Sequence, residues 1–266
     1  MIICVKNLTV RGIYVEDYTM TSQQMPSFAP IDNPMIRFNS SGYLTKSGAF
    51  YTPQQAYTFV GNLPAFLKWF AKMVHVFGDG FRSVNIVSIY PFVDENKPLG
   101  FVFVDADVWC NGKPVPGGAL LRGGSVSILL FLVALENTQR RFVVRTLHPR
   151  VPIGEANYEE NIAGRIAAEE VLVEIANANA SAITIHQDEC TYLGSFVPSA
   201  GGCDEEIEVF RAVKVLPLME ILALKGSQQG ISKEEDYIRD IKEKRITDGK
   251  ALASLALHLL NPLILD

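Results

Sequence analysis

The chain has 266 residues, of which 48% are hydrophobic and 20% are charged. This balance is typical of a folded globular protein, and the length suffices for one large domain or two smaller ones. A formal net charge of −5 without a basic tract argues against a general nucleic-acid-binding protein. The cysteines, Cys4, Cys110, Cys190 and Cys203, are scattered, so the pattern indicates neither a zinc site nor a disulfide framework.

The sequence gives no indication of a membrane or secretory destination. The apolar run at residues 2–5 is too short for a secretory signal, and the stronger run at 126–135 is too short to cross a bilayer. We therefore expect a cytoplasmic protein in a reducing compartment with no membrane partner, and an organelle import signal is left open.

The first half of the chain predicts an irregular or β-containing lead-in, a helix and then strands. Residues 1–50 are rich in Ser, Thr, Asn and Pro, whereas apolar residues recur at helical spacing over 53–76, with an internal boundary at Pro64. Alternating patterns predict strands at 84–90 and 101–109, and Asn111-Gly112 predicts a hairpin into the segment around Val115.

The second half predicts further strands around one central helix. The run at 125–135 is apolar throughout, which favours a central strand buried on both faces. Strands that come before, around and after one central helix indicate a mixed α/β (α+β) sandwich without regular βαβ alternation. The remaining predicted elements are strands at 141–147, 182–186, 192–197 and 206–214, loops at 149–158, 198–202 and 225–230, and helices at 160–176, 216–224 and 249–260.

Two acidic residues stand out in the predicted central helix. Glu170 and Glu174 are four residues apart, so a helix would place both carboxylates on one face, where like charges repel. No Lys or Arg lies three or four residues from either of them. The pattern has two interpretations, a divalent-cation site and a solvated acidic face.

Several short motifs, read in order from about residue 66 to residue 260, resemble the Nudix hydrolases. The resemblance is specifically to the plant-type nucleotide-sugar diphosphatases, which cleave ADP-sugars and UDP-glucose. No assignment is made for residues 1 to about 55. The motifs, besides the stretch with Glu170 and Glu174, are 66–69 (Phe-Leu-Lys-Trp), 100–103 (Gly-Phe-Val-Phe), 113–117 (Lys-Pro-Val-Pro-Gly), 122–123 (Arg-Gly), 150–152 (Arg-Val-Pro), 201–206 (Gly-Gly-Cys-Asp-Glu-Glu) and 248–252 (Asp-Gly-Lys-Ala-Leu).

The resemblance implies a fold and an assembly. It implies a Nudix-type α/β/α sandwich with a mixed sheet over residues 119–266, preceded by a smaller N-terminal region with a helix and β strands over residues 1–118. It also implies a homodimer in which the N-terminal region contributes to the interface.

The resemblance also implies residue roles. Glu170 and Glu174 would hold Mg²⁺ or Mn²⁺, for which carboxylate oxygens are suitable ligands. The general base would come from the glycine-rich loop, with Glu205 as the first choice and Glu206 as the second. Arg122 and Arg150 are candidates for the substrate phosphates, since a guanidinium fork matches phosphate oxygens; the alternative is a surface or interface role.

The Nudix signature departs from the family pattern at several positions. Glu169 replaces the usual Arg, Val173 replaces a Glu and Ala176 replaces a Gly. The signature glycine is either Gly154 or absent together with most of the preceding strand. Two functions are therefore predicted: a Mg²⁺-dependent hydrolase giving a nucleoside monophosphate and a sugar 1-phosphate, and an inactive Nudix domain that binds a nucleotide or another protein.

Overall fold

The computed structural model describes residues 35–45, 48–91, 100–165, 173–177, 180–185, 189–224 and 229–261. These residues form two compact units. The amino-terminal unit contains the described residues up to 123 together with 199–205, and the carboxy-terminal unit contains those of 124–198 and 206–261. Most of the predicted lead-in over 1–50 lies outside the described residues.

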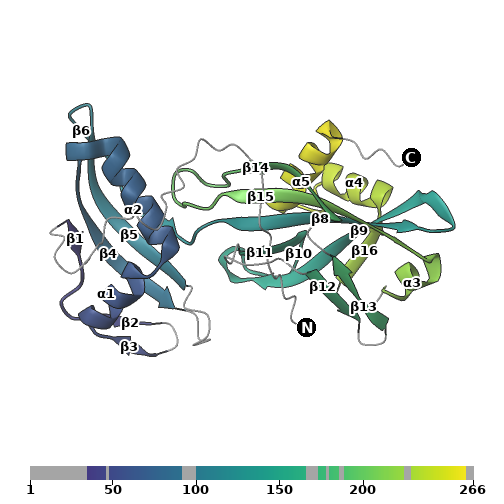
Figure 1. Ribbon diagram of the computed structural model, residues 1–266, viewed down its shortest axis with the longest axis horizontal. Helices are drawn as coiled ribbons and strands as arrows, with labels where there is room; N and C mark the ends of the chain where they lie inside the picture. The colour runs from purple at the N-terminus through teal and green to yellow at the C-terminus, as the bar shows by residue number, and fades with distance from the viewer. Residues whose placement is uncertain are drawn as a thin grey trace. The chain divides into compact units, whose positions relative to one another are not determined.

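The amino-terminal unit is built on a sheet around two long antiparallel strands (Figure 1). Strand β4 (Phe81–Pro91) pairs with β5 (Gly100–Cys110), and β5 continues through the predicted hairpin at Asn111-Gly112 into β6 (Lys113–Val115). Strand β7 (Gly118–Leu121) also pairs with β5, and β1 (Ile36–Arg37) runs parallel to β4. A small separate ribbon is formed by β2 (Tyr43–Leu44) and β3 (Phe50–Tyr51).

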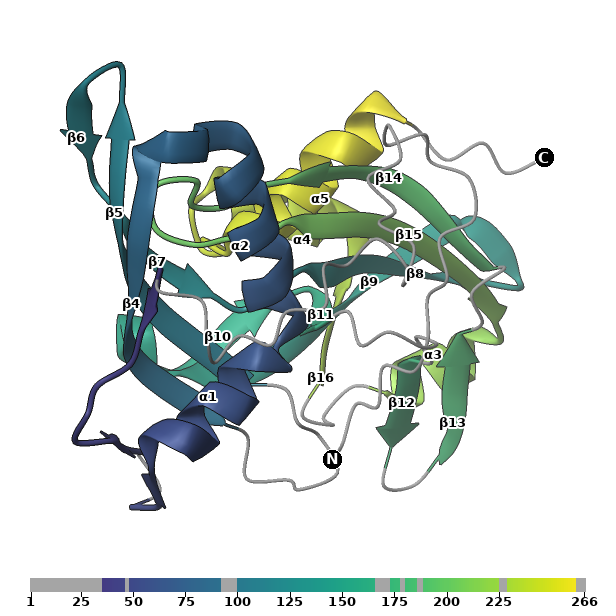
Figure 2. The same cartoon turned by 60° about the vertical axis from the view of Figure 1, so that its left-hand side comes forward.

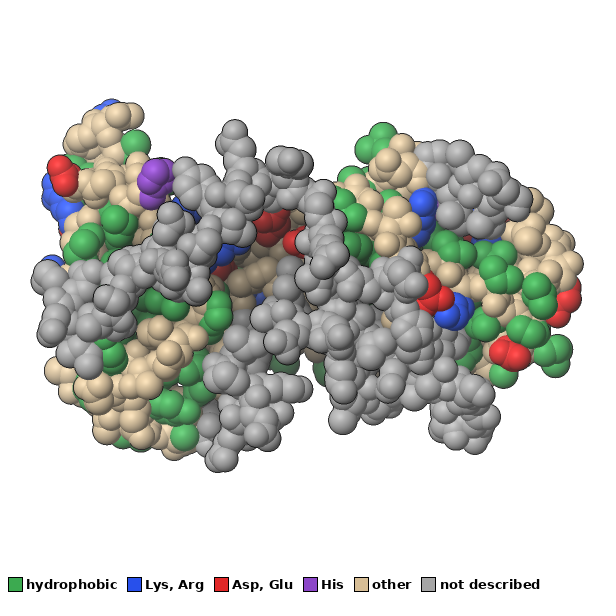
Figure 3. Space-filling model, in the orientation of Figure 1, with side chains coloured by type: hydrophobic (Ala, Val, Ile, Leu, Met, Phe, Trp, Pro, Cys, Tyr) green, Lys and Arg blue, Asp and Glu red, His purple; other side chains and the backbone are tan. Residues whose placement is uncertain are grey.

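Two helices cover one face of this sheet (Figure 2). Helix α1 (Pro53–Gly61) begins with a capping box at Thr52, and helix α2 (Pro64–Phe77) begins directly at the proline that marked the predicted boundary. Proline has no backbone N–H, which the first turn of a helix does not need but its interior does. One helix therefore ends before Pro64, and the next begins there. Figure 3 shows hydrophobic side chains exposed over the region of α1, β2 and β3, where Leu44 and Phe50 are exposed.

The carboxy-terminal unit contains a seven-stranded mixed sheet in the order β10-β9-β8-β15-β14. Strand β8 is parallel to β15 and antiparallel to β9, while β11 adds to β8 and β16 adds to β9. A separate hairpin is formed by β12 and β13. The strands are β8 (Ser125–Ala134), β9 (Asn137–Arg150), β10 (Glu155–Glu160), β11 (Ile162–Arg165), β12 (Val173–Asn177), β13 (Ala180–Ile185), β14 (Cys190–Phe196), β15 (Ile207–Leu216) and β16 (Gln229–Lys233).

Every residue of β8 is buried, which confirms the prediction of a strand buried on both faces. Its side chains alternate between two core clusters, because successive residues of a strand point to opposite faces. One cluster includes residues of helix α3 (Leu218–Ala223). The other includes residues of α4 (Glu234–Lys242) and α5 (Gly249–Leu260), which lie side by side in both views of the ribbon.

The helix predicted over 160–176 is wrong wherever its residues are described. Residue Glu160 ends β10, residues 162–165 form β11 and residues 173–177 form β12, so Glu174 lies on a strand opposite Thr184. Backbone pairing of β10 with β9 and of β11 with β8 overrides the helix propensity of the Ala- and Glu-rich sequence. Gly164 also disfavours a helix, and β-branched Val173 and Ile175 favour a strand.

The loop predicted over 149–158 is also partly wrong, because β10 begins at Glu155. Strand β10 follows residues 150–152, so the strand that the resemblance places before the signature glycine is present rather than deleted. Gly154 precedes that strand, at a turn with a φ of +72°, and so it is not the glycine that ends it. Strand β16 and helix α4 were not predicted.

The prediction of a mixed α/β architecture with a mixed sheet is confirmed. Helices flank the sheet on both faces of β8, and the sheet is mixed because β8 pairs in parallel with β15 and antiparallel with β9. Among the described residues, no helix combines the length and the apolar character needed to cross a bilayer.

Candidate functional site

The glycine-rich loop is tied to the end of β7 by the side chain of Asp204. Its carboxylate accepts the backbone N–H of Arg122 at 2.7 Å and that of Gly123 at 3.1 Å. The backbone of Leu120 adds hydrogen bonds on both sides, donating to Gly202 and accepting from Asp204. Gly123 has a φ of +78°, a left-handed conformation that favours glycine. Two motifs about eighty residues apart in the chain thus form one rigid corner.

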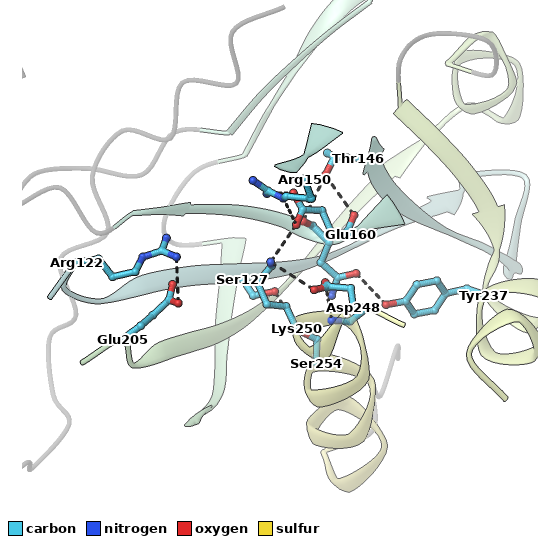
Figure 4. A network of polar contacts seen from close by, with 12 residues as sticks. Arg122, Ser127, Thr146, Arg150, Glu160, Glu205, Tyr237, Asp248, Lys250 and Ser254 are labelled. Carbon is cyan, nitrogen blue, oxygen red and sulfur yellow. Dashed lines mark hydrogen bonds and ion pairs between the residues drawn. The ribbon is translucent and has the colours of Figure 1, made fainter. Parts of the chain in front are cut away.

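This corner places two of the predicted site residues against each other. The guanidinium of Arg122 lies 3.2 Å from the carboxylate of Glu205 (Figure 4). Glu205 is nearly buried, whereas a third of the Arg122 side chain is exposed. The same guanidinium lies 5.5 Å from the ring of Phe101, within the range of a cation–π contact. The predicted base and a predicted phosphate ligand therefore form one ion pair.

Cys203 lies in the same corner, beside Arg122 and Glu205. Burial raises the pKa of its thiol above the ordinary value, with neighbouring carboxylates acting in the same direction. A thiol with a raised pKa is a poor nucleophile at neutral pH, so no role in catalysis is assigned to it. Glu206, the second choice for the base, accepts a hydrogen bond from the Ser195 hydroxyl at 2.7 Å.

The fourth predicted residue, Arg150, belongs to a polar cluster of the carboxy-terminal unit whose acidic side chains are buried (Figure 4). Arg150 ends β9 and Glu160 ends β10, and the two side chains form a two-point ion pair through Nε and Nη2 of the guanidinium. The Lys250 ammonium lies 3.0 Å from the same carboxylate and 3.4 Å from Asp248. Asp248 in turn caps α5 by accepting the backbone N–H of Ala251 at 3.0 Å.

Asn161, the residue that follows Glu160, extends the polar cluster into the core. Its side chain is fully buried, and its Oδ1 accepts a hydrogen bond from the Tyr237 hydroxyl at 2.8 Å. Burial, more than any other influence, raises the pKa of Tyr237 far above its ordinary value. The Thr146 hydroxyl donates to the backbone oxygen of Glu160 at 3.2 Å. The end of β10 is thereby fixed from both sides.

The predicted metal ligands are not brought together in the described part of the chain. Glu170 lies outside the described residues, and Glu174 lies on β12 rather than on a helix. No group of three or more His, Cys, Asp or Glu side chains suited to a metal ion occurs among the described residues. The carboxylate of Glu205 already has a guanidinium as its counter-ion. A metal site at Glu170 and Glu174 therefore stays a prediction, since the described residues include only one of the two.

Sequence reasoning missed Glu160 and the residues that hold it. Lys250 and Asp248 were part of a recognised motif, which was the available signal, but no role had been assigned to either. Glu160 stands in a polar stretch without alternation, so nothing in the sequence distinguishes it from the exposed acidic residues beside it.

The resemblance of the motifs to those of the Nudix hydrolases is confirmed by the similarity of the chain to a curated relative of that class. That relative is Nudix hydrolase 14, chloroplastic, from Arabidopsis thaliana, which is 27% identical over 204 residues. The match covers 69% of this chain and 65% of the relative, so the chain spans just under two thirds of the relative's length.

No protein-family model matches the chain. Among solved structures, the chain is similar to the crystal structure of an ADP compounds hydrolase, with a TM-score of 0.39 and 8% sequence identity. That similarity covers 68% of this chain and 94% of the other.

Proposed function

We propose that the protein is a diphosphate-bond hydrolase of the Nudix type, with a nucleotide sugar such as an ADP-sugar or UDP-glucose as its substrate. The order of motifs and the similarity to Nudix hydrolase 14 support this class. Water would attack one phosphorus of the diphosphate and break its bond to the bridging oxygen. The products would be a nucleoside monophosphate and a sugar 1-phosphate.

The observation that carries the proposal is the rigid corner made by Asp204, Arg122 and Glu205. The Asp204 carboxylate fixes the backbone at Arg122, and the Arg122 guanidinium in turn orients the Glu205 carboxylate. Glu205 would take the proton from the attacking water, and Arg122 would contact a phosphate oxygen. An arginine and a carboxylate that are already positioned lose little freedom when substrate binds.

Three further features belong to the proposal, and the first two of them rest on the resemblance to the Nudix hydrolases. They are a requirement for Mg²⁺ or Mn²⁺ through Glu170 and Glu174, a homodimeric assembly, and a cytoplasmic location. The metal requirement is tested by chelation and by Glu174→Gln, which should abolish metal-dependent release of monophosphate. Sedimentation equilibrium tests the dimer, and a fluorescent fusion tests the location.

The activity is tested with a panel of ADP-ribose, ADP-glucose and UDP-glucose, each with Mg²⁺ or Mn²⁺, by coupling the released monophosphates to a phosphatase. Glu205→Gln should lower kcat by at least about a hundredfold, as expected for loss of a general base. Glu220→Gln on the exposed surface of α3 is the control and should leave the rate unchanged. An equal rate in Glu205→Gln and in the control would contradict the assignment.

A second candidate function is binding of a nucleotide without hydrolysis. The placement of Glu174 on β12, opposite Thr184, favours it, since Glu174 does not lie on the helix that was predicted to carry the metal ligands. ADP-ribose would then raise the melting temperature without being consumed, because a ligand that binds only the folded state stabilises it. Release of monophosphate from any compound of the panel would exclude this candidate.

A further inference from the structure

Arg150 is held by its inner edge and presents its outer edge to solvent. The Glu160 carboxylate accepts hydrogen bonds from Nε, at 3.2 Å, and from Nη2 of the guanidinium. The Glu160 side chain is 1% exposed, whereas that of Arg150 is 43% exposed. The buried member of this pair thus fixes the orientation of the exposed one.

The Glu160 carboxylate is itself firmly fixed. A buried carboxylate needs compensating charge and hydrogen bonds, and the Lys250 ammonium supplies both at 3.0 Å. Lys250 is fixed in turn by Asp248, and the backbone of Glu160 is fixed by Thr146. The carboxylate therefore cannot follow Arg150 toward solvent, and the guanidinium has to adopt the orientation that Glu160 sets.

The outer edge of the guanidinium is chemically suited to a phosphate. A guanidinium donates along two edges, and Glu160 occupies the edge made by Nε and Nη2. Within the described residues, Glu160 is the one side chain that forms an ion pair with this guanidinium. The edge made by Nη1 and the second N–H of Nη2 remains, and its two parallel donors match two oxygens of a phosphate.

We propose that Glu160 is a positioning residue that presents the outer edge of Arg150 to the diphosphate of the substrate. The identity of the ligand rests on the proposed function, whereas the positioning by Glu160 rests on the contacts alone. Arg150 touches the ligand in this arrangement, and Glu160 and Lys250 act only through it.

The test measures binding of inorganic pyrophosphate to the full chain by titration calorimetry at low ionic strength. Arg150→Lys keeps the charge but loses the fork, and the affinity should fall about tenfold. The matched control is Arg245→Lys, since Arg245 is 54% exposed and also paired with carboxylates. That control should bind pyrophosphate as the unmodified protein does.

The role of Glu160 is separated from a merely structural one by a double-mutant cycle. Glu160→Gln should also weaken binding about tenfold, but it should have no further effect when Arg150 is already Lys. Should Glu160→Gln fail to fold, as judged by circular dichroism, Glu160→Asp serves in its place, because it withdraws the carboxylate by one methylene and keeps its charge.

Two results would overturn the proposal: unchanged affinity in Arg150→Lys, or an equal loss from Glu160→Gln in both backgrounds. Failure of the proposed function gives a different result, because nucleotide sugars would then remain intact while the cycle for pyrophosphate still shows coupling. Turnover of nucleotide sugars with no coupling in the cycle would overturn the role of Glu160 and leave the proposed function standing.

Discussion

Replacing Lys250 by Met removes the cation that lies between two buried carboxylates. Met keeps most of the length and packing of the lysine stem, so the change isolates the charge. In the structure, the ammonium lies 3.0 Å from Glu160 and 3.4 Å from Asp248, and the lysine side chain is 20% exposed. Its loss leaves Glu160 with Arg150 alone.

These contacts set limits on how much Lys250→Met lowers the free energy of unfolding. Breaking a fully buried ion pair costs about 3–5 kcal/mol. Here Arg150 still compensates Glu160, and the N-terminus of α5 still compensates Asp248, so we expect a loss of about 2 kcal/mol in the free energy of unfolding. With a urea m-value of about 2 kcal/mol/M, the midpoint would fall by about 1 M.

The assay is urea unfolding followed by far-ultraviolet circular dichroism, with Lys242→Met as the control. Lys242 ends α4, is exposed, and should change the stability by less than about 0.5 kcal/mol. If Lys250→Met were as stable as Lys242→Met, the charge compensation at Glu160 would be contradicted.

Three further changes test other parts of the structure. Asp204→Ala should cost about 2 kcal/mol in a urea titration, because two backbone N–H groups lose a charged acceptor. Tyr237→Phe should cost about 1–2 kcal/mol in the same measurement, since the buried Asn161 side chain loses its donor. The His258 hydrogen bond, above all, holds the pKa of Glu234 below its ordinary value of 4.5, so this carboxylate stabilises the fold above that pH and the effect is lost as the pH falls through the folded-state pKa. Glu234→Gln should therefore lower the melting temperature at about pH 6 and have little effect at about pH 3.

Strong local patterns were enough to predict much of the fold. The run through β8 is apolar at every position, and the proline at the start of α2 has a local effect on the helix, so both could be read without tertiary information. The helix over 160–176 was predicted wrongly because its composition favours a helix, whereas pairing with β8 and β9 determines the structure.

Residues of the candidate site could be predicted from the sequence only where they belong to a recognised short motif. Arg122 and Glu205 both stand in recognised motifs, although their pairing depends on Asp204 and could not be read from the sequence. Glu160 pairs with Arg150 and also with Lys250, which lies 90 residues further along the chain, and only the folded chain brings the three together.

The central claim, hydrolysis of a diphosphate bond, is tested most directly by phosphorus NMR of ADP-ribose and UDP-glucose incubated with the purified protein and Mg²⁺. We predict that the two coupled diphosphate signals of at least one compound are replaced by two phosphomonoester signals, and that Glu205→Gln suppresses this change. Diphosphate signals that stay unchanged for both compounds, with Mg²⁺ and also with Mn²⁺, would contradict it.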